Sequence, residues 1–199
     1  MRFDDPQATE MSMFSLILFI LVLHLVQVAY DGVQPVTATL LSLLMIVHVR
    51  MLDIFVAPLG AVGLSAGKVW QRGEFSRIFI SPLYHVSDWH LLYCMVSFAM
   101  KARCIEPYFG KGLFFWLVAA YAVIVNALVI PLAYMAYGIF GDSTFISRHA
   151  FGITGIIFAL KVLTTQLIID GNARVFVWAE FIIANMLMPR TTALSRWLP

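Results

Sequence analysis

Long apolar runs separated by short polar segments dominate the pattern of this 199-residue chain. A helix rises about 1.5 Å per residue, so about 20 apolar residues cross a hydrocarbon layer about 30 Å thick. The pattern therefore predicts a set of membrane-crossing helices. Six apolar segments are candidates: 11–30, 36–49 with a continuation toward 56, 88–103, 112–138, 150–169 and 175–188.

Residues 58–87 break this pattern. Four glycines interrupt the segment, and Lys68, Arg72 and Arg77 alternate with Trp70 and Phe75. A segment this polar is costly to bury in hydrocarbon, and its mixture of aromatic and basic residues is typical of the membrane interface. We expect a loop with amphipathic character that joins two spans without crossing.

Charged and helix-breaking residues set the end predicted for the span at 88–103. Lys101 and Arg103 are expected to end that helix, and the following Glu106–Lys111 stretch, with Pro107, is expected to turn the chain. The next span then begins near residue 112.

Composition agrees with a polytopic membrane protein, since 61% of the residues are hydrophobic and 12% are charged. That charged fraction is about half of what soluble domains carry. The 13 Lys and Arg are scattered, so no basic face favours nucleic acid as a partner, and their distribution does not fix the orientation of the spans. Cys94 and Cys104 would lie about 15 Å apart on a straight helix, which excludes a disulfide between them.

One apolar segment, 150–162, carries a hydroxyl among small residues at the expected start of a helix. Gly152, Thr154 and Gly155 form a Gly-x-Thr-Gly motif there. In membrane helices such residues most often serve close packing. A hydroxyl in that position has a chemical role only if other groups meet it.

Other motifs accompany it in a fixed order. They are Arg77-x-x-x-Ser81-x-x-x-His85-x-x-x-x-His90-x-x-x-Cys94, then Glu106-x-x-x-Gly110, and then Gly152-x-Thr154-Gly155 followed by Phe158-Ala159-Leu160-Lys161-Val162. This order and spacing resembles the rhomboid family of intramembrane serine proteases over roughly residues 33–190. The run at 158–162, together with Pro35-Val36-Thr37, is most similar to the animal rhomboids of the endoplasmic reticulum.

The resemblance implies a particular chemistry. Rhomboids cleave transmembrane substrates with a Ser–His dyad, and a His-x-x-x-Asn motif helps to bind the oxyanion. Here Thr154 stands at the nucleophile position, His90 on the oxyanion side and Cys94 at the Asn position. Arg196 stands at the position of the dyad His, and it cannot act as a base because it stays protonated.

Five further residues are expected to line the site: Gly152, Gly155, His85 and Arg77 by the same resemblance, and His149 because it comes just before the Gly-x-Thr-Gly motif. His149 is either a substitute base for Thr154 or an ordinary interfacial histidine. The two interpretations stay open at this point.

The sequence therefore predicts an all-α, polytopic transmembrane helical bundle that is rhomboid-like and lacks the last core helix. Its expected parts are a tail with an extra apolar helix at 1–32, a truncated rhomboid-like domain at 33–190 and a short polar tail at 191–199. The resemblance implies location in the endoplasmic reticulum membrane, no metal or organic cofactor, and transmembrane-protein substrates or clients as partners. Without the last core helix, polar groups such as Thr154 and His90 would face lipid, so we expect either the span at 11–30 or another subunit, in a homo- or hetero-oligomer, to fill the gap.

Three functional hypotheses follow. The altered catalytic positions favour an inactive rhomboid-like protein that binds clients in membrane-protein quality control or trafficking, as the derlins and inactive rhomboids do. The alternative is an active endopeptidase, either with a longer natural sequence or with Thr154 as its nucleophile. A more remote alternative is a small metal or haem carrier, because His90 and Cys94 are four apart on one helical face and His85 and His149 could lie at the same membrane level.

Overall fold

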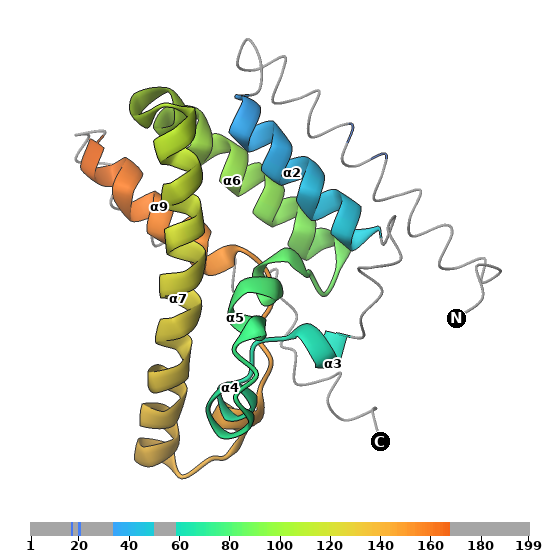
Figure 1. Cartoon of the computed structure of the whole chain (residues 1–199), viewed down its shortest axis with the longest axis vertical. Helices are drawn as coiled ribbons and strands as arrows, with labels where there is room; N and C mark the ends of the chain where they lie inside the picture. Colours follow the sequence, from blue (N-terminus) through green and yellow to red (C-terminus); the bar gives the residue numbers. More distant parts are fainter. Residues whose placement is uncertain (1–16, 18–19, 21–33, 50–58, 168–199) are drawn as a thin grey trace, which may run out of the picture.

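The computed structural model describes residues 17, 20, 34–49 and 59–167 (Figure 1). In these ranges the regular structure is helical, apart from one isolated antiparallel bridge, which confirms the predicted all-α class. The predicted spans at 11–30 and 175–188, and the predicted end units, lie outside the described residues except for Ile17 and Ile20. The helices are α2 (Pro35–His48), α3 (Leu59–Val62), α4 (Ala66–Arg72), α5 (Ser76–Ile80), the 3₁₀ turn η2 (Ser81–Leu83), α6 (Asp88–Phe109), α7 (Lys111–Phe140), α8 (Thr144–Ser147) and α9 (Thr154–Leu167).

Helices α2 and α6 lie side by side and run in opposite directions (Figure 1). At one end, the buried carboxylate of Glu106 on α6 accepts hydrogen bonds from the N–H groups of Val36 and Thr37, both at 2.9 Å, and from the Thr37 hydroxyl at 2.7 Å. The first turn of a helix leaves N–H groups unpaired, and Pro35 contributes none. Glu106 therefore caps α2 from a distance of 69 residues in sequence.

The opposite ends of the two helices are joined by a contact between two side chains. The Nε2 atom of His48, the last residue of α2, lies 2.6 Å from an oxygen of Asp88, the first residue of α6. An acidic side chain at a helix N-terminus complements the helix dipole. Side-chain contacts thus join α2 and α6 at both ends of the pair.

The main core lies where α2, α6, α7 and α9 meet. Its fully buried side chains include Leu41, Phe98, Phe114, Ile157 and Leu160, with Phe98 and Phe114 in ring contact. Burying such a side chain contributes about 1.5–3 kcal/mol against water. Where lipid is the surroundings, dense packing replaces part of that driving force.

Helix α6 is longer than the sequence pattern predicted. The expectation that Lys101 and Arg103 end it is wrong, because the helix continues to Phe109. The ammonium group of the buried Lys101 bonds to the hydroxyl of Ser97, one turn earlier, at 2.7 Å, so the charge has a polar partner within the helix. The helix ends at Gly110, whose φ of +78° suits glycine.

Helix α7 confirms the span predicted at 112–138. It runs for 30 residues from Lys111 to Phe140, and among the described residues it is the helix that is long and apolar enough to cross a membrane. Its outward face exposes large apolar side chains, among them Leu113, Trp116, Leu128 and Met135. A lipid environment suits a face of this kind.

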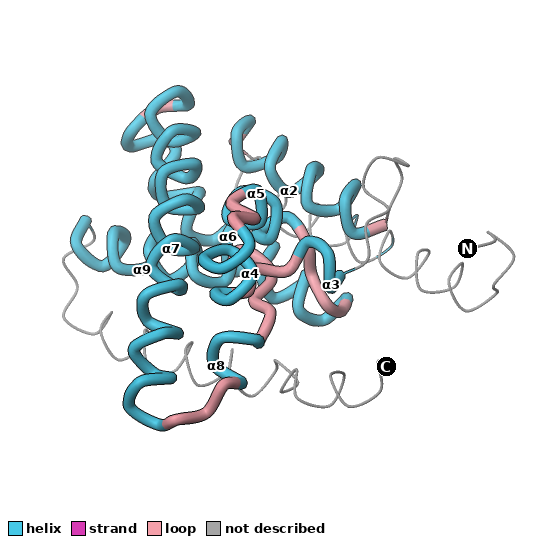
Figure 2. Tube along the Cα trace, turned by 60° about the horizontal axis from the view of Figure 1, so that its bottom comes forward, coloured by secondary structure: helices cyan, strands magenta, loops and turns pink. Residues whose placement is uncertain are grey.

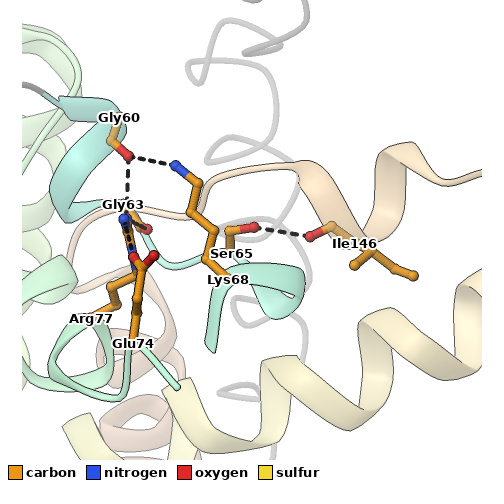
Figure 3. Close-up of polar contacts among 7 residues, drawn as sticks. All are labelled: Gly60, Gly63, Ser65, Lys68, Glu74, Arg77 and Ile146. Atoms are coloured by element: carbon orange, nitrogen blue, oxygen red, sulfur yellow. Dashed lines mark hydrogen bonds and ion pairs between the residues drawn. The ribbon is translucent and has the colours of Figure 1, made fainter. Parts of the chain in front are cut away.

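The segment between α2 and α6 forms short helices joined by loops, as Figure 2 shows. The longest, α4, has seven residues and is far too short to cross a bilayer, as predicted for 58–87. Arg77 organises this segment (Figure 3): its buried guanidinium donates to the carbonyl oxygens of Gly60 and Gly63 and pairs with Glu74. Lys68 donates to the same Gly60 oxygen at 3.0 Å.

Two polar contacts join the short helices to the rest of the bundle. The amide nitrogen of Asn126, within α7, donates to the carbonyl oxygen of Ile78 at 2.7 Å. The hydroxyl of Ser65 donates to the carbonyl oxygen of Ile146 at 3.0 Å (Figure 3). The loop segment is therefore attached both to α7 and to the turn that leads into α9.

Candidate functional site

The approach to α9 is held by backbone hydrogen bonds. Ala150 and Leu64 exchange N–H···O bonds of 2.8 and 3.0 Å, and the N–H of Gly152 donates to the carbonyl oxygen of Ser81 at 3.1 Å. Gly152 has a φ of +81°, a conformation that residues with a Cβ rarely adopt. Helix α9 then begins at Thr154, so the Gly-x-Thr-Gly motif marks a helix start as predicted.

The hydroxyl of Thr154 meets two side chains of α6. It lies 3.1 Å from Nε2 of His90 and 3.6 Å from the sulfur of Cys94. Because His90 and Cys94 are four residues apart, α6 presents them on one face, and both are buried. Ser87 caps α6 by accepting from the N–H of His90 at 3.2 Å, which orders the turn that carries this histidine.

His85 completes a histidine pair. Its ring meets that of His90 edge-on, with 5.0 Å between centroids, and its side chain is 5% exposed. A Cβ on Gly152 would lie 2.9 Å from the His90 ring and 3.1 Å from the His85 ring, so glycine allows the loop to approach both. Burial, with His90 and His48 nearby, holds the pKa of His85 well below its ordinary value and keeps the imidazole neutral at neutral pH.

The other residues expected to line the site occupy different places. Arg77 binds the α3 turn, as described above. His149 stacks on Phe151, with 6.3 Å between centroids and 16° between planes, whereas the hydroxyl of Thr154 points to His90. Gly155 faces α7, where a Cβ would lie 2.4 Å from Val125, so it permits close packing of the two helices. Arg196 lies outside the described residues.

The environment of His149 is electropositive. Partial burial lowers the pKa of His149, and the nearby Lys68 and Arg77 lower it further. A neutral imidazole can accept a proton, but the stacking on Phe151 gives this one a structural role in the loop.

An apolar cavity of about 130 Å³ lies beside this cluster. Ile153 and Ile156, which flank Thr154 in sequence, form one wall. The remaining walls come from α2, α5, η2, α6 and α7: Leu40, Leu44, Phe79, Pro82, Leu83, Phe98, Phe115, Val118, Ala119 and Ala122. Thr154 itself does not line this cavity, which adjoins the start of α9 through Ile153 and Ile156 and suits an apolar side chain.

The family model for the Rhomboid domain matches residues 72–197, which is more than half of the chain and includes the whole cluster around Thr154. The chain belongs to the rhomboid family. It is accordingly an integral membrane protein, and its helices form a rhomboid-like bundle.

Individual rhomboid relatives agree with this assignment. Rhomboid-related protein 4 of Homo sapiens and of Mus musculus are each 26% identical over 184 residues, covering 88% of this chain and 57% of the relative. Rhomboid-like protein 14, mitochondrial, of Arabidopsis thaliana is 26% identical over 172 residues, covering 81% of this chain and 52% of the relative. The chain thus spans between half and three fifths of the length of these rhomboids. No solved structure matches.

Two features of this rhomboid site were missed by the sequence analysis. The contact between His48 and Asp88 joins residues that are 40 positions apart in sequence, and no local motif predicts it. The contact between the His85 and His90 rings depends on the turn formed by η2 and Ser87, which spacing alone does not define. The motif spacing predicted that His90 and Cys94 would lie near Thr154. It did not predict which pairs of side chains in the site would be in contact.

Proposed function

We propose that this rhomboid binds transmembrane helices of client proteins without cleaving them. The observation that carries this proposal is the chemistry at Thr154. Its hydroxyl is secondary, with a β-methyl that crowds attack, and its neighbour Cys94 is a weak hydrogen-bond donor where the family pattern has an amide. An oxyanion needs strong preorganised donors, and losing one costs about 3–4 kcal/mol of transition-state stabilisation.

The rest of the arrangement supports recognition. The cap formed by Glu106, the Arg77 anchor and the close approach at Gly152 are intact, so the bundle keeps its shape around an altered centre. The apolar cavity beside Ile153 and Ile156 can take a side chain from a client helix. Such clients would be transmembrane proteins undergoing quality control or trafficking.

One contact favours the alternative, an active intramembrane endopeptidase. The Thr154 hydroxyl lies within hydrogen-bond distance of the imidazole of His90, which is the geometry of a nucleophile and its base. In that mechanism His90 Nε2 would accept the hydroxyl proton as the oxygen attacks the scissile carbonyl.

A reconstituted cleavage and binding assay separates the two functions. Wild type, Thr154→Ala and Thr154→Ser are placed in proteoliposomes with a model transmembrane substrate that carries a photo-crosslinker. Thr165→Ala is the matched control, because the hydroxyl of this exposed threonine of α9 donates to the carbonyl oxygen of Val162 in its own helix. We expect crosslinked complex from all four proteins and cleavage from none, except that Thr154→Ser regains a trace.

Cleavage by wild type that is lost in Thr154→Ala and kept in Thr165→Ala would establish the endopeptidase instead. Absence of any crosslink from folded protein would contradict client binding.

We further propose the endoplasmic reticulum membrane as the location, on the basis of the sequence resemblance, and assembly into homo- or hetero-oligomers, in which another subunit covers the groups that the last core helix covers in the family. A plant relative carries the word mitochondrial in its name, so the two organelles are compared directly. Fluorescence of a tagged chain should coincide with a reticulum marker. Coincidence with a mitochondrial marker would overturn the assignment.

A further inference from the structure

Three metal-binding side chains meet at the centre of this rhomboid. Ring nitrogens of His85 and His90 and the sulfur of Cys94 all lie within 4.8 Å of one another, and all three side chains are buried. Both histidines belong to the family pattern, whereas Cys94 stands where that pattern has Asn, so the thiol adds a third metal-ligating side chain beside the pair.

The hydrogen bonding of His85 provides an independent indication. Within the part of the chain that the structure describes, neither of its buried ring nitrogens makes a hydrogen bond of regular geometry. A buried polar atom left unpaired costs about 1–3 kcal/mol, and native structures contain few. The His85 ring packs edge-on against His90, and one of its ring nitrogens lies within 4.8 Å of the Cys94 sulfur.

We propose that His85, His90 and Cys94 bind one thiophilic metal cation, Zn²⁺ or Cu⁺. Two imidazoles and a thiolate form a donor set that both ions accept. The expectation of a protein without metal is replaced by this proposal, which goes beyond client binding and does not depend on it.

The distances between the ligand atoms of His85, His90 and Cys94 are slightly longer than a bound ion requires. Zinc takes nitrogen at about 2.0–2.1 Å and sulfur at about 2.3 Å, which places neighbouring ligand atoms about 3.5 Å apart. The ligand atoms now lie within 4.8 Å of one another, so metal binding requires the two imidazoles to move toward Cys94 by about 1 Å. The Thr154 hydroxyl, 3.1 Å from His90 and 3.6 Å from Cys94, lies where a fourth, oxygen ligand is accommodated.

The scaffold holds the ligands on well-anchored elements. Helix α6 supplies His90 and Cys94 at i and i+4, and Gly152 closes the opposite side against both rings. On binding, the Cys94 thiol releases its proton to solvent and the sulfur donates as thiolate. The complex then carries one positive charge with Zn²⁺ and none with Cu⁺. The nearby His48 is already paired with Asp88 and is not counted as a ligand.

The test measures metal on the full chain in detergent micelles or nanodiscs. Protein stripped with chelator is reloaded with Zn²⁺, or with Cu⁺ under reducing conditions, and bound metal is counted by mass spectrometry. We expect one equivalent of one of the two ions, and the arm that saturates at the lower concentration identifies the ion. Co²⁺ supplies a spectroscopic signature, because a thiolate ligand gives a sulfur-to-metal charge-transfer band.

Matched variants decide whether the cluster is responsible. Cys94→Ser is compared with Cys104→Ser, and His85→Asn with His149→Asn, since Cys104 is exposed and His149 lies outside the cluster. Removing a ligand should weaken binding by more than about 100-fold, which exceeds the effect of outer-shell changes. The two controls should bind as wild type does, and circular dichroism verifies that every variant is folded.

Failure to retain either ion, or equal binding by ligand variants and controls, would overturn the proposal. Loss of metal from Cys94→Ser with client crosslinking unchanged would leave the proposed function intact. Loss of crosslinking with metal retained would contradict the function but not this site.

Discussion

At the scale of single residues, Gly152 explains how a loop can lie directly against two imidazole rings. Its positive φ and its missing Cβ are both required, because a Cβ would approach the His90 ring to 2.9 Å. The same glycine donates its N–H to Ser81. One residue therefore sets the distance between the start of α9 and the histidine pair.

Gly152→Ala should lower the free energy of unfolding by about 2–4 kcal/mol, from backbone strain and overpacking together. Gly138→Ala is the matched control, because that glycine is helical and has open space around it. The control should be neutral or gain about 0.5–1 kcal/mol. Denaturant titration of both variants in micelles measures the difference, and equal stabilities would show that the close approach is absent.

His149 should make stability depend on pH. Its folded pKa is lowered by burial and by the cations Lys68 and Arg77, so folding disfavours the charged imidazole. Stability is therefore fully present above the ordinary pKa of about 6.5 and falls as pH drops below it, until the folded pKa is passed.

Thermal unfolding at pH 8 and pH 5 tests this prediction. His149→Gln should lose less stability on acidification than wild type does. Lys68→Gln should reduce the acid loss partly, because it removes one of the two cations that oppose the charge. Identical pH profiles for wild type and His149→Gln would contradict the prediction.

At the scale of elements, α2 depends on α6 for its N-terminal cap. The Gln34 side chain makes no cap hydrogen bond, and Glu106 supplies acceptors for two N–H groups and a hydroxyl. Hydrogen bonds to a charged group are worth about 1.5–3 kcal/mol. The Glu106-x-x-x-Gly110 and Pro35-Val36-Thr37 motifs thus serve one structural purpose in this chain.

A double-mutant cycle measures the coupling free energy between Glu106 and Thr37. Glu106→Gln should destabilise by about 2–3 kcal/mol and Thr37→Val by about 1 kcal/mol. Their combination should cost about 1 kcal/mol less than the sum, because the two residues share a bond. Thr39→Val is the control and should change little, since its exposed hydroxyl bonds to Pro35 in the same helix. Strict additivity would exclude the coupling.

The sequence predicted the elements to the extent that they depend on local pattern. Helix α7, the non-crossing segment at 58–87 and the helix start at Thr154 follow from hydropathy, glycine and small-residue motifs. The end of α6 was misjudged because the charge of Lys101 is satisfied by Ser97 inside the helix.

The sequence predicted which residues form the candidate site more fully than it predicted the contacts between them. Thr154, His90 and Cys94 do meet, as the motif spacing indicated. The unpaired nitrogens of His85 and the separate position of His149 depend on three-dimensional turns that the sequence pattern does not determine.

At the scale of the whole molecule, α7 has two environments. One side packs on α6 and α9, and the other exposes apolar side chains that lipid would cover. Its inner side also lines the cavity beside Thr154, through Val118, Ala119 and Ala122. Client binding, if it uses this cavity, depends on space beside α7.

Ala122→Phe should fill the cavity and reduce client crosslinking by about fivefold or more, the equivalent of about 1 kcal/mol. Ala127→Phe adds the same group to an exposed position of α7 and should leave crosslinking unchanged. The crosslinking assay in proteoliposomes measures both. An equal decrease in the two variants would show that the cavity has no special part in binding.

Contacts at both ends of α2, with Glu106 and with Asp88, restrict how α2 can move relative to α6. Sliding α2 along its axis by one residue, about 1.5 Å, would break the Glu106 contacts and the His48–Asp88 pair together. We therefore expect α2 and α6 to move together as one rigid unit. Under the proposed function, we expect a client helix that enters the cavity to displace α7 or the short helices rather than α2.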